Sequence, residues 1–169
     1  MTETTWIAGL PKEVIIVGMA MLPILELRGA IPWALKFAPQ IPLVKTYLLA
    51  VGGNFIPVIP ILLLLDPVSR FLRRAPIFDR FFRWLFARTR RRGKLIERYE
   101  AIGLTLFVAV PLPVTGAWTG ALAAFVFGIR FRWAVVCIGL GILIAGVVVT
   151  LAAKGAISFL DWAIGSSGA

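Results

Sequence analysis

The distribution of apolar segments along the chain is the feature that most constrains its fold. The run from Trp133 to Ala153 is uncharged and, as a helix, long enough to cross a hydrocarbon core about 30 Å thick. The run from Leu43 to Leu65 is also long enough, but glycines, Asn54 and two prolines interrupt it, which predicts a kink. With a mean hydropathy of +0.93, the chain suits a bilayer better than water. We predict one all-α integral membrane domain over residues 1–169.

Two other apolar regions are too short to cross. Residues 14–25 would form a helix about 18 Å long, and a second short apolar stretch occupies residues 33–38. Between them lies Glu26-Leu27-Arg28-Gly29-Ala30-Ile31-Pro32. This pattern predicts a re-entrant hairpin, in which two half-helices meet at a polar turn inside the membrane.

The second half of the chain repeats this plan. Residues 101–110 and 121–129 are apolar, and the segment from Pro111 to Gly120 interrupts them. We therefore predict one repeat over about residues 12–65 and another over about 101–153, each with a hairpin followed by a transmembrane helix. For the tail, residues 154–169, we expect a last interfacial or partly inserted helix around 157–164.

The connection between the repeats is strongly basic. Residues 66–100 contain 11 of the 18 Lys and Arg residues. Positive loops of membrane proteins stay in the cytoplasm, which explains the charge better than nucleic-acid binding does. Five apolar residues share one arc of a helical wheel, which predicts an amphipathic interfacial helix: Phe78, Phe81, Phe82, Leu85 and Phe86. With residues 66–100 cytoplasmic, the hairpins enter from opposite faces of the cell (inner) membrane, as in an inverted-topology repeat.

The residue inventory excludes most enzyme chemistry. The chain has no histidine, and its one cysteine, Cys137, is most simply a core residue. Imidazole or thiolate metal sites, a Ser-His-Asp triad and a disulfide framework therefore lack their residues. We expect no metal, no cofactor and no enzyme activity, and proton chemistry near neutral pH would require a carboxylate with a raised pKa.

Glu26 and Arg28 are the strongest candidates for a functional site. Charged side chains at membrane depth cost at least about 2.5 kcal/mol each, so they usually mark a transport pathway. Glu26 is predicted to bind a proton, and Arg28 an anionic group such as phosphate. Gly29 and Pro32 would allow the non-helical backbone that lets both side chains face one cavity. The alternative is an ion pair that pins the hairpins together.

The second interruption supplies further candidates. Thr115, Trp118 and Thr119 are its polar members, and Gly116 permits close approach of a substrate to the backbone. Close helix packing is an equal explanation for Gly116 and Gly120. Secondary candidates are Asn54, for which an interhelical hydrogen bond is the simpler account, and Arg130, which flanks the second hairpin.

Two motifs, ELRGAIP at residues 26–32 and PLPVTGAWTGALAA at residues 111–124, resemble the small multidrug export protein family, which is related to the DedA superfamily. The resemblance implies two opposed re-entrant hairpins and transport. DedA-like proteins are associated with proton-dependent transport or flipping of lipid carriers such as polyprenyl phosphate. By motif match, the functional positions are Glu26, Arg28, Thr115, Gly116, Thr119 and Gly120. DedA proteins carry an arginine near the second loop, whereas this chain has Arg130 and Arg132 only beyond it.

Three functions follow from these observations. The first is proton-coupled transport or flipping of an anionic or lipid-phosphate substrate. The second is export of lipophilic cations, which the positive charge of Arg28 disfavours. The third is a non-transport, membrane-organising role through binding of anionic lipids. Membrane lipids, protons and a small-molecule or lipid substrate are the expected partners, with no nucleic acid. We expect a homodimer, because two hairpins and two spans alone would leave little protein to shield a polar cavity from lipid.

Overall fold

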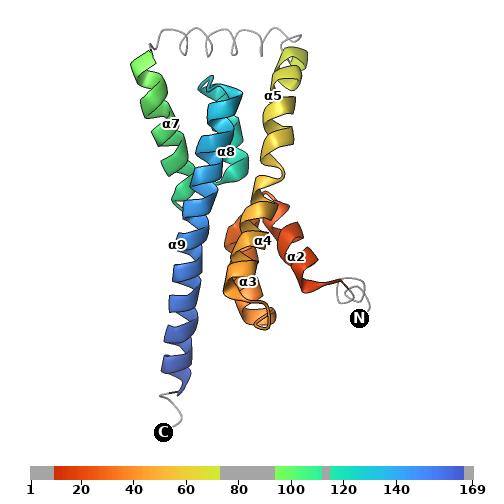
Figure 1. Cartoon of the computed structure of the whole chain (residues 1–169), viewed down its shortest axis with the longest axis vertical. Helices are drawn as coiled ribbons and strands as arrows, with labels where there is room; N and C mark the ends of the chain where they lie inside the picture. Colours follow the sequence, from red (N-terminus) through yellow and green to blue (C-terminus); the bar gives the residue numbers. More distant parts are fainter. Residues whose placement is uncertain (1–9, 73–93, 112–114, 166–169) are drawn as a thin grey trace. The chain divides into compact units, whose positions relative to one another are not determined.

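A computed structural model describes residues 10–72, 94–111 and 115–165, and the regular structure in these ranges is entirely helical. This confirms the all-helical prediction for the described residues. The helices are α2 (Lys12–Met21), α3 (Glu26–Phe37), α4 (Leu43–Phe55), α5 (Val58–Leu72), α7 (Lys94–Ala109), α8 (Ala117–Val126) and α9 (Phe131–Gly165) (Figure 1).

The chain divides into two compact units. Unit 1 comprises Met1–Asn54 and Ile144–Ala169, and unit 2 comprises Phe55–Leu143. Unit 1 therefore holds α2, α3, α4 and the C-terminal part of α9, whereas unit 2 holds α5, α7, α8 and the N-terminal part of α9. Each unit combines one pair of short helices with parts of the long helical segments. An inverted relation between the two halves stays a prediction.

In unit 1, α2 and α3 pack against each other as a hairpin (Figure 1). The predicted turn at residues 26–32 is wrong, because the turn lies at residues 22–25 and Glu26 already begins α3. Pro23 is the physical reason, since a proline favours an extended conformation in the residue before it, and Leu22 has φ −74° and ψ 136°. Gly29 and Pro32, expected in the turn, lie inside α3.

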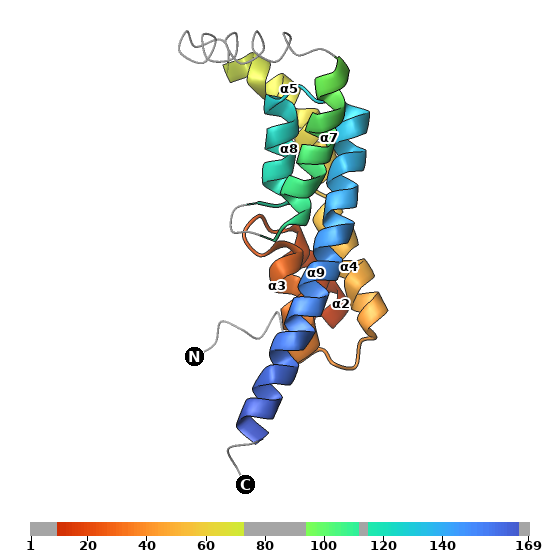
Figure 2. The same ribbon diagram turned by 90° about the vertical axis from the view of Figure 1, so that its left-hand side faces the viewer.

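In unit 2, α7 and α8 form the second hairpin (Figure 2). The predicted interruption is present but shorter than expected, because α8 begins at Ala117. Trp118 and Thr119 therefore lie in the first turn of a helix. The N–H of Gly116 donates a hydrogen bond of 2.9 Å to Thr119 Oγ1, which fixes this helix start.

Two helical segments are long and apolar enough to cross a membrane: Leu43–Leu65 and Phe131–Leu160. The predicted kink in the first is confirmed as a break at residues 56 and 57, between α4 and α5. Residues 157–164 are helical as expected, but they form the end of α9 rather than a last helix of their own, because no proline follows Phe131 to stop it. Large apolar side chains recur on one exposed face of α9, as expected for contact with lipid: Trp133, Val136, Leu140, Val147 and Leu151.

Glycines allow close helix packing inside each unit. A Cβ on Gly53 would lie 2.8 Å from the carbonyl oxygen of Val17, so α4 touches the backbone of α2. In unit 2, a Cβ on Gly120 would lie 2.5 Å from Val108 Cγ2, so α8 packs closely against the Val108 side chain of α7. Cys137 is 5% exposed, which confirms it as a core residue. The predicted amphipathic helix around Phe78–Phe86 lies outside the described residues, although α5 and α7 extend into both ends of the basic connection.

Candidate functional site

Glu26 is a buried carboxylate at the tip of the first hairpin. Its side chain is 6% exposed, and its backbone N–H donates a hydrogen bond of 3.0 Å to the carbonyl of Leu22. Its φ of 47° lies in the left-handed region, and Glu26 is the one described non-glycine residue with a positive φ. Such a conformation costs about 1–3 kcal/mol and is found preferentially at functional sites. The turn therefore holds a charged residue in a strained backbone conformation.

Arg28 lies two residues further along α3 and is partly buried. The charge of Glu26 acts on the Arg28 guanidinium, and both residues have contacts inside the protein. Two residues apart on a regular helix they would point in different directions. The left-handed backbone of Glu26 provides the departure from helical geometry that the sequence analysis assigned to Gly29 and Pro32.

Asn54 lies at the end of α4 and is 1% exposed. Its Oδ1 atom is buried and accepts no hydrogen bond from the residues that the structure describes. The prediction of an interhelical hydrogen bond for Asn54 is therefore wrong for its Oδ1 atom. Every buried polar or charged residue in the described ranges belongs to unit 1: Glu26, Thr46, Asn54 and Thr150.

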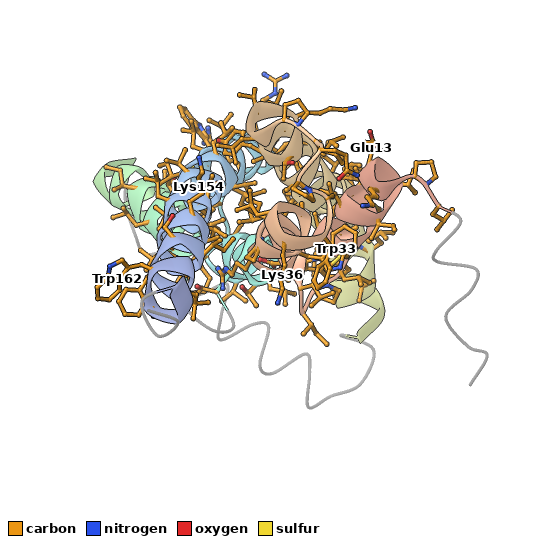
Figure 3. The ribbon with its side chains drawn as sticks, turned by 90° about the horizontal axis from the view of Figure 1, so that it is seen from below. Glu13, Trp33, Lys36, Lys154 and Trp162 are labelled. Atoms are coloured by element: carbon orange, nitrogen blue, oxygen red, sulfur yellow. The ribbon has the colours of Figure 1, made fainter. Side chains whose placement is uncertain are left out.

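The outer end of the first hairpin carries an ion pair that sequence reasoning missed. Lys45 Nζ on α4 donates a hydrogen bond of 2.9 Å to Glu13 Oε1 on α2, which holds the pKa of Glu13 below its ordinary value. Lys12 Nζ donates a hydrogen bond of 2.6 Å to the carbonyl of Phe37, at the end of α3. The charged Lys12-Glu13 dipeptide before the first apolar run was the available signal. Figure 3 shows Glu13 on α2 in the view from below.

Other labelled residues in Figure 3 are typical of a membrane–water interface. Trp33 and Lys36 lie on α3, and Lys154 and Trp162 lie on α9. Lys36 and Lys154 are exposed, and Trp162 is 68% exposed. Tryptophan and snorkelling lysine side chains are enriched where hydrocarbon meets headgroups.

The predicted residues of the second loop lie in unit 2. Thr115 Oγ1 donates a hydrogen bond of 2.9 Å to the carbonyl of Val110, and Thr119 Oγ1 accepts the Gly116 N–H. Trp118 is half-buried in the first turn of α8, whereas Arg130 is exposed just before α9. The tight contact of Gly120 with Val108 favours packing as the reason for that glycine.

The candidate residues thus form two groups. Glu26, Arg28, Gly29, Pro32 and Asn54 belong to unit 1. The others belong to unit 2: Thr115, Gly116, Trp118, Thr119 and Arg130. Their convergence on one substrate stays a prediction. Among the described residues, no three His, Cys, Asp or Glu side chains are placed to hold a metal ion.

Comparison with protein families decides the broad assignment. A family model described as "Putative small multi-drug export protein" matches residues 26–148, which is most of the chain and includes both hairpin motifs. The chain belongs to this family. Membership in the small multi-drug export family implies a membrane export protein, and a transporter rather than an enzyme. No curated protein and no solved structure matches the chain.

Proposed function

We propose that this member of the small multi-drug export family is a DedA-like, proton-coupled transporter of the cell (inner) membrane. Its substrate is an anionic molecule or a lipid phosphate, for example a polyprenyl phosphate carrier, which it moves or flips across the bilayer. Glu26 binds and releases the coupling proton, and Arg28 binds the anionic group of the substrate.

The burial of Glu26 beside Arg28 is the observation that carries this proposal. Glu26 is 6% exposed, in a chain whose described helices present apolar faces suited to lipid. Burial in a low dielectric favours the neutral form of a carboxyl group, and the nearby guanidinium favours the charged form. A carboxylate under these opposed influences can change protonation when an anionic substrate occupies Arg28.

The composition of the two units supports transport as well. Each unit contains a broken hairpin and parts of the long helical segments. Secondary transporters build substrate sites from broken helices of two repeats, with half-helix N-termini facing anionic groups. Glu26 and Arg28 lie in the first turn of α3, and Trp118 and Thr119 lie in the first turn of α8.

Replacement of Glu26 by glutamine tests the proposal, because it keeps the shape and removes the titratable proton. The full chain is reconstituted in liposomes, and movement of a fluorescent polyprenyl phosphate is followed under an imposed pH gradient. We expect Glu26→Gln to abolish pH-driven movement and Glu13→Gln to retain it, since Glu13 is an exposed carboxylate of the same unit. If the wild type moves the lipid at a rate that does not depend on the pH gradient, or if Glu26→Gln moves it at an unchanged rate, the proposed proton role of Glu26 is refuted.

Export of lipophilic cations is the second candidate, because the family description names multi-drug export. A cation exporter would exchange a proton for a drug at Glu26, and Arg28 would repel that drug. Arg28→Gln therefore separates the two candidates in the same liposomes, with ethidium as the cationic probe. Faster ethidium movement in Arg28→Gln favours drug export, whereas loss of phosphate-lipid movement favours the anionic substrate.

The third function, organisation of anionic lipids without transport, predicts a different result for Glu26→Gln. If Glu26 served only to pair with Arg28, its replacement would leave a buried charge unbalanced and lower thermal stability. No solute or lipid movement would then depend on the wild-type protein. Any pH-driven movement above that of empty liposomes excludes this function.

A further inference from the structure

Asn54 is a buried polar side chain to which the proposed proton and anion steps give no role. It is 1% exposed, and its Oδ1 atom has no hydrogen-bond donor among the described residues. A buried acceptor left without a donor costs about 1–3 kcal/mol, and this cost is rarely tolerated without a purpose. A polar group of this kind, inside a segment long enough to span a membrane, points to a ligand.

Contacts within unit 1 show where the end of α4 lies relative to α2. Near their N-terminal ends, α2 and α4 are joined by the ion pair between Glu13 and Lys45. Further along, Gly53 of α4 lies against Val17 and Ala20 of α2. The two helices therefore run in the same direction, and α2 ends at Met21 while α4 ends at Phe55. Asn54 lies where both helices end, within about one turn of their contact.

The C-terminal end of a helix presents carbonyl oxygens, which are hydrogen-bond acceptors. The last carbonyls of a helix lack intrahelical donors, and the helix dipole places about half a negative charge there. At the end of α2, the Met19 carbonyl accepts the N–H of Leu22. After α4, Pro57 has no N–H and cannot donate the usual helical hydrogen bond to the carbonyl of Gly53. Asn54, in the last turn of α4, therefore lies in a region of negative potential.

We propose that Asn54 Oδ1 and the carbonyls at the C-terminal end of α4 bind a monovalent alkali cation, with Na⁺ as the physiological ion. Neutral oxygens are hard ligands that suit alkali cations, and they do not retain a bare proton at neutral pH. Transition metals bind mostly to imidazole, thiolate and carboxylate side chains, and the described residues contain no group of three such side chains placed to hold one. In transporters with broken helices, unwound carbonyls and half-helix C-termini coordinate Na⁺ in this manner.

The role of the bound Na⁺ as a second coupling ion rests on the proposed transport function. Binding itself can be measured without transport. A ligand that binds only the folded state raises the folding equilibrium constant about a hundredfold when its concentration is one hundred times its Kd. Sodium should therefore stabilise the purified protein specifically.

The experiment follows thermal unfolding of the full chain in detergent micelles. NaCl replaces KCl or choline chloride at constant ionic strength, so that screening of surface charges stays the same. We expect the unfolding temperature of the wild type to rise with Na⁺ concentration and to saturate, with little response to choline. Equal unfolding temperatures in the three salts would overturn the proposal.

Variants assign the effect to Asn54. Asn54→Leu removes the oxygen and should abolish the Na⁺ response, whereas Thr46→Val, at another buried polar position of α4, should retain it. If Asn54→Leu does not fold, Asn54→Asp decides the question, since a negatively charged carboxylate should bind Na⁺ more tightly than the neutral amide. A Na⁺ response that survives in Asn54→Leu, or that is unchanged in Asn54→Asp, would overturn the assignment.

Glu26→Gln separates this site from the proton step. Its loss of pH-driven movement tests the proposed function, whereas its Na⁺-dependent stabilisation tests the cation site. We expect Glu26→Gln to lose the first and to keep the second. A protein that keeps pH-driven substrate movement but shows no Na⁺-dependent stabilisation would refute the cation site alone.

Discussion

Adjacent glycines in α4 provide a quantitative test of helix packing in unit 1. A methyl group on Gly53 would lie 2.8 Å from the Val17 carbonyl oxygen and 3.1 Å from Val17 Cα. Both are backbone atoms, so α2 itself would have to move. A methyl group on Gly52 would meet nothing within 4 Å. The two positions share a helix and differ in what faces them.

The expected difference in stability between the Gly53→Ala and Gly52→Ala variants follows from these contacts. Replacing either glycine by alanine favours the helix by about 0.5–1 kcal/mol, and this gain cancels when the two variants are compared. Overpacking at Gly53 costs about 1–3 kcal/mol. We therefore predict that Gly53→Ala is less stable than Gly52→Ala by about 1–3 kcal/mol. Unfolding in mixed micelles of increasing dodecyl sulfate content, followed by circular dichroism, measures this difference, and equal stability of the two variants would refute the packing of α2 on α4.

Two further predictions concern single polar contacts. Because the lowered pKa of Glu13 reflects its hydrogen bond from Lys45, the pair stabilises the fold above the ordinary Glu pKa of about 4.3, and this stabilisation is lost as pH falls through the lowered value. The small advantage of the wild type over Glu13→Gln in thermal unfolding should therefore vanish in acid, and an advantage that grows in acid would contradict the ion pair. Thr119→Ala removes the acceptor of the Gly116 N–H and should destabilise the chain by about 0.5–2 kcal/mol, whereas Thr119→Ser should retain stability in the same assay.

Apolar run length and proline positions predicted the main features of the fold. The long apolar runs correspond to the two candidate spans, and the kink in the first occurs at Pro57. The first turn comes earlier than Gly29 and Pro32 predict, because α3 accommodates both residues. A proline also restricts the residue before it, so the extended conformation of Leu22 before Pro23 ended α2.

The candidate site was less predictable, because its properties depend on contacts between helices. Burial of Glu26 could be expected from its place between apolar segments, but its left-handed backbone could not. The ion pair between Glu13 and Lys45 joins residues from two helices, and sequence spacing does not indicate it. The unsatisfied oxygen of Asn54 likewise became visible only once its neighbours were placed.

Accessibility of position 26 tests the central claim most directly. With Cys137 replaced by alanine, a single cysteine is introduced at position 26 or at position 13, and its reaction with a membrane-impermeant maleimide is timed in intact membranes. Glu26 is buried, whereas the side chain of Glu13 is 39% exposed, so the cysteine at position 26 should react far more slowly. Equally fast reaction at the two positions would place residue 26 in bulk water and contradict a buried carboxylate inside the bilayer.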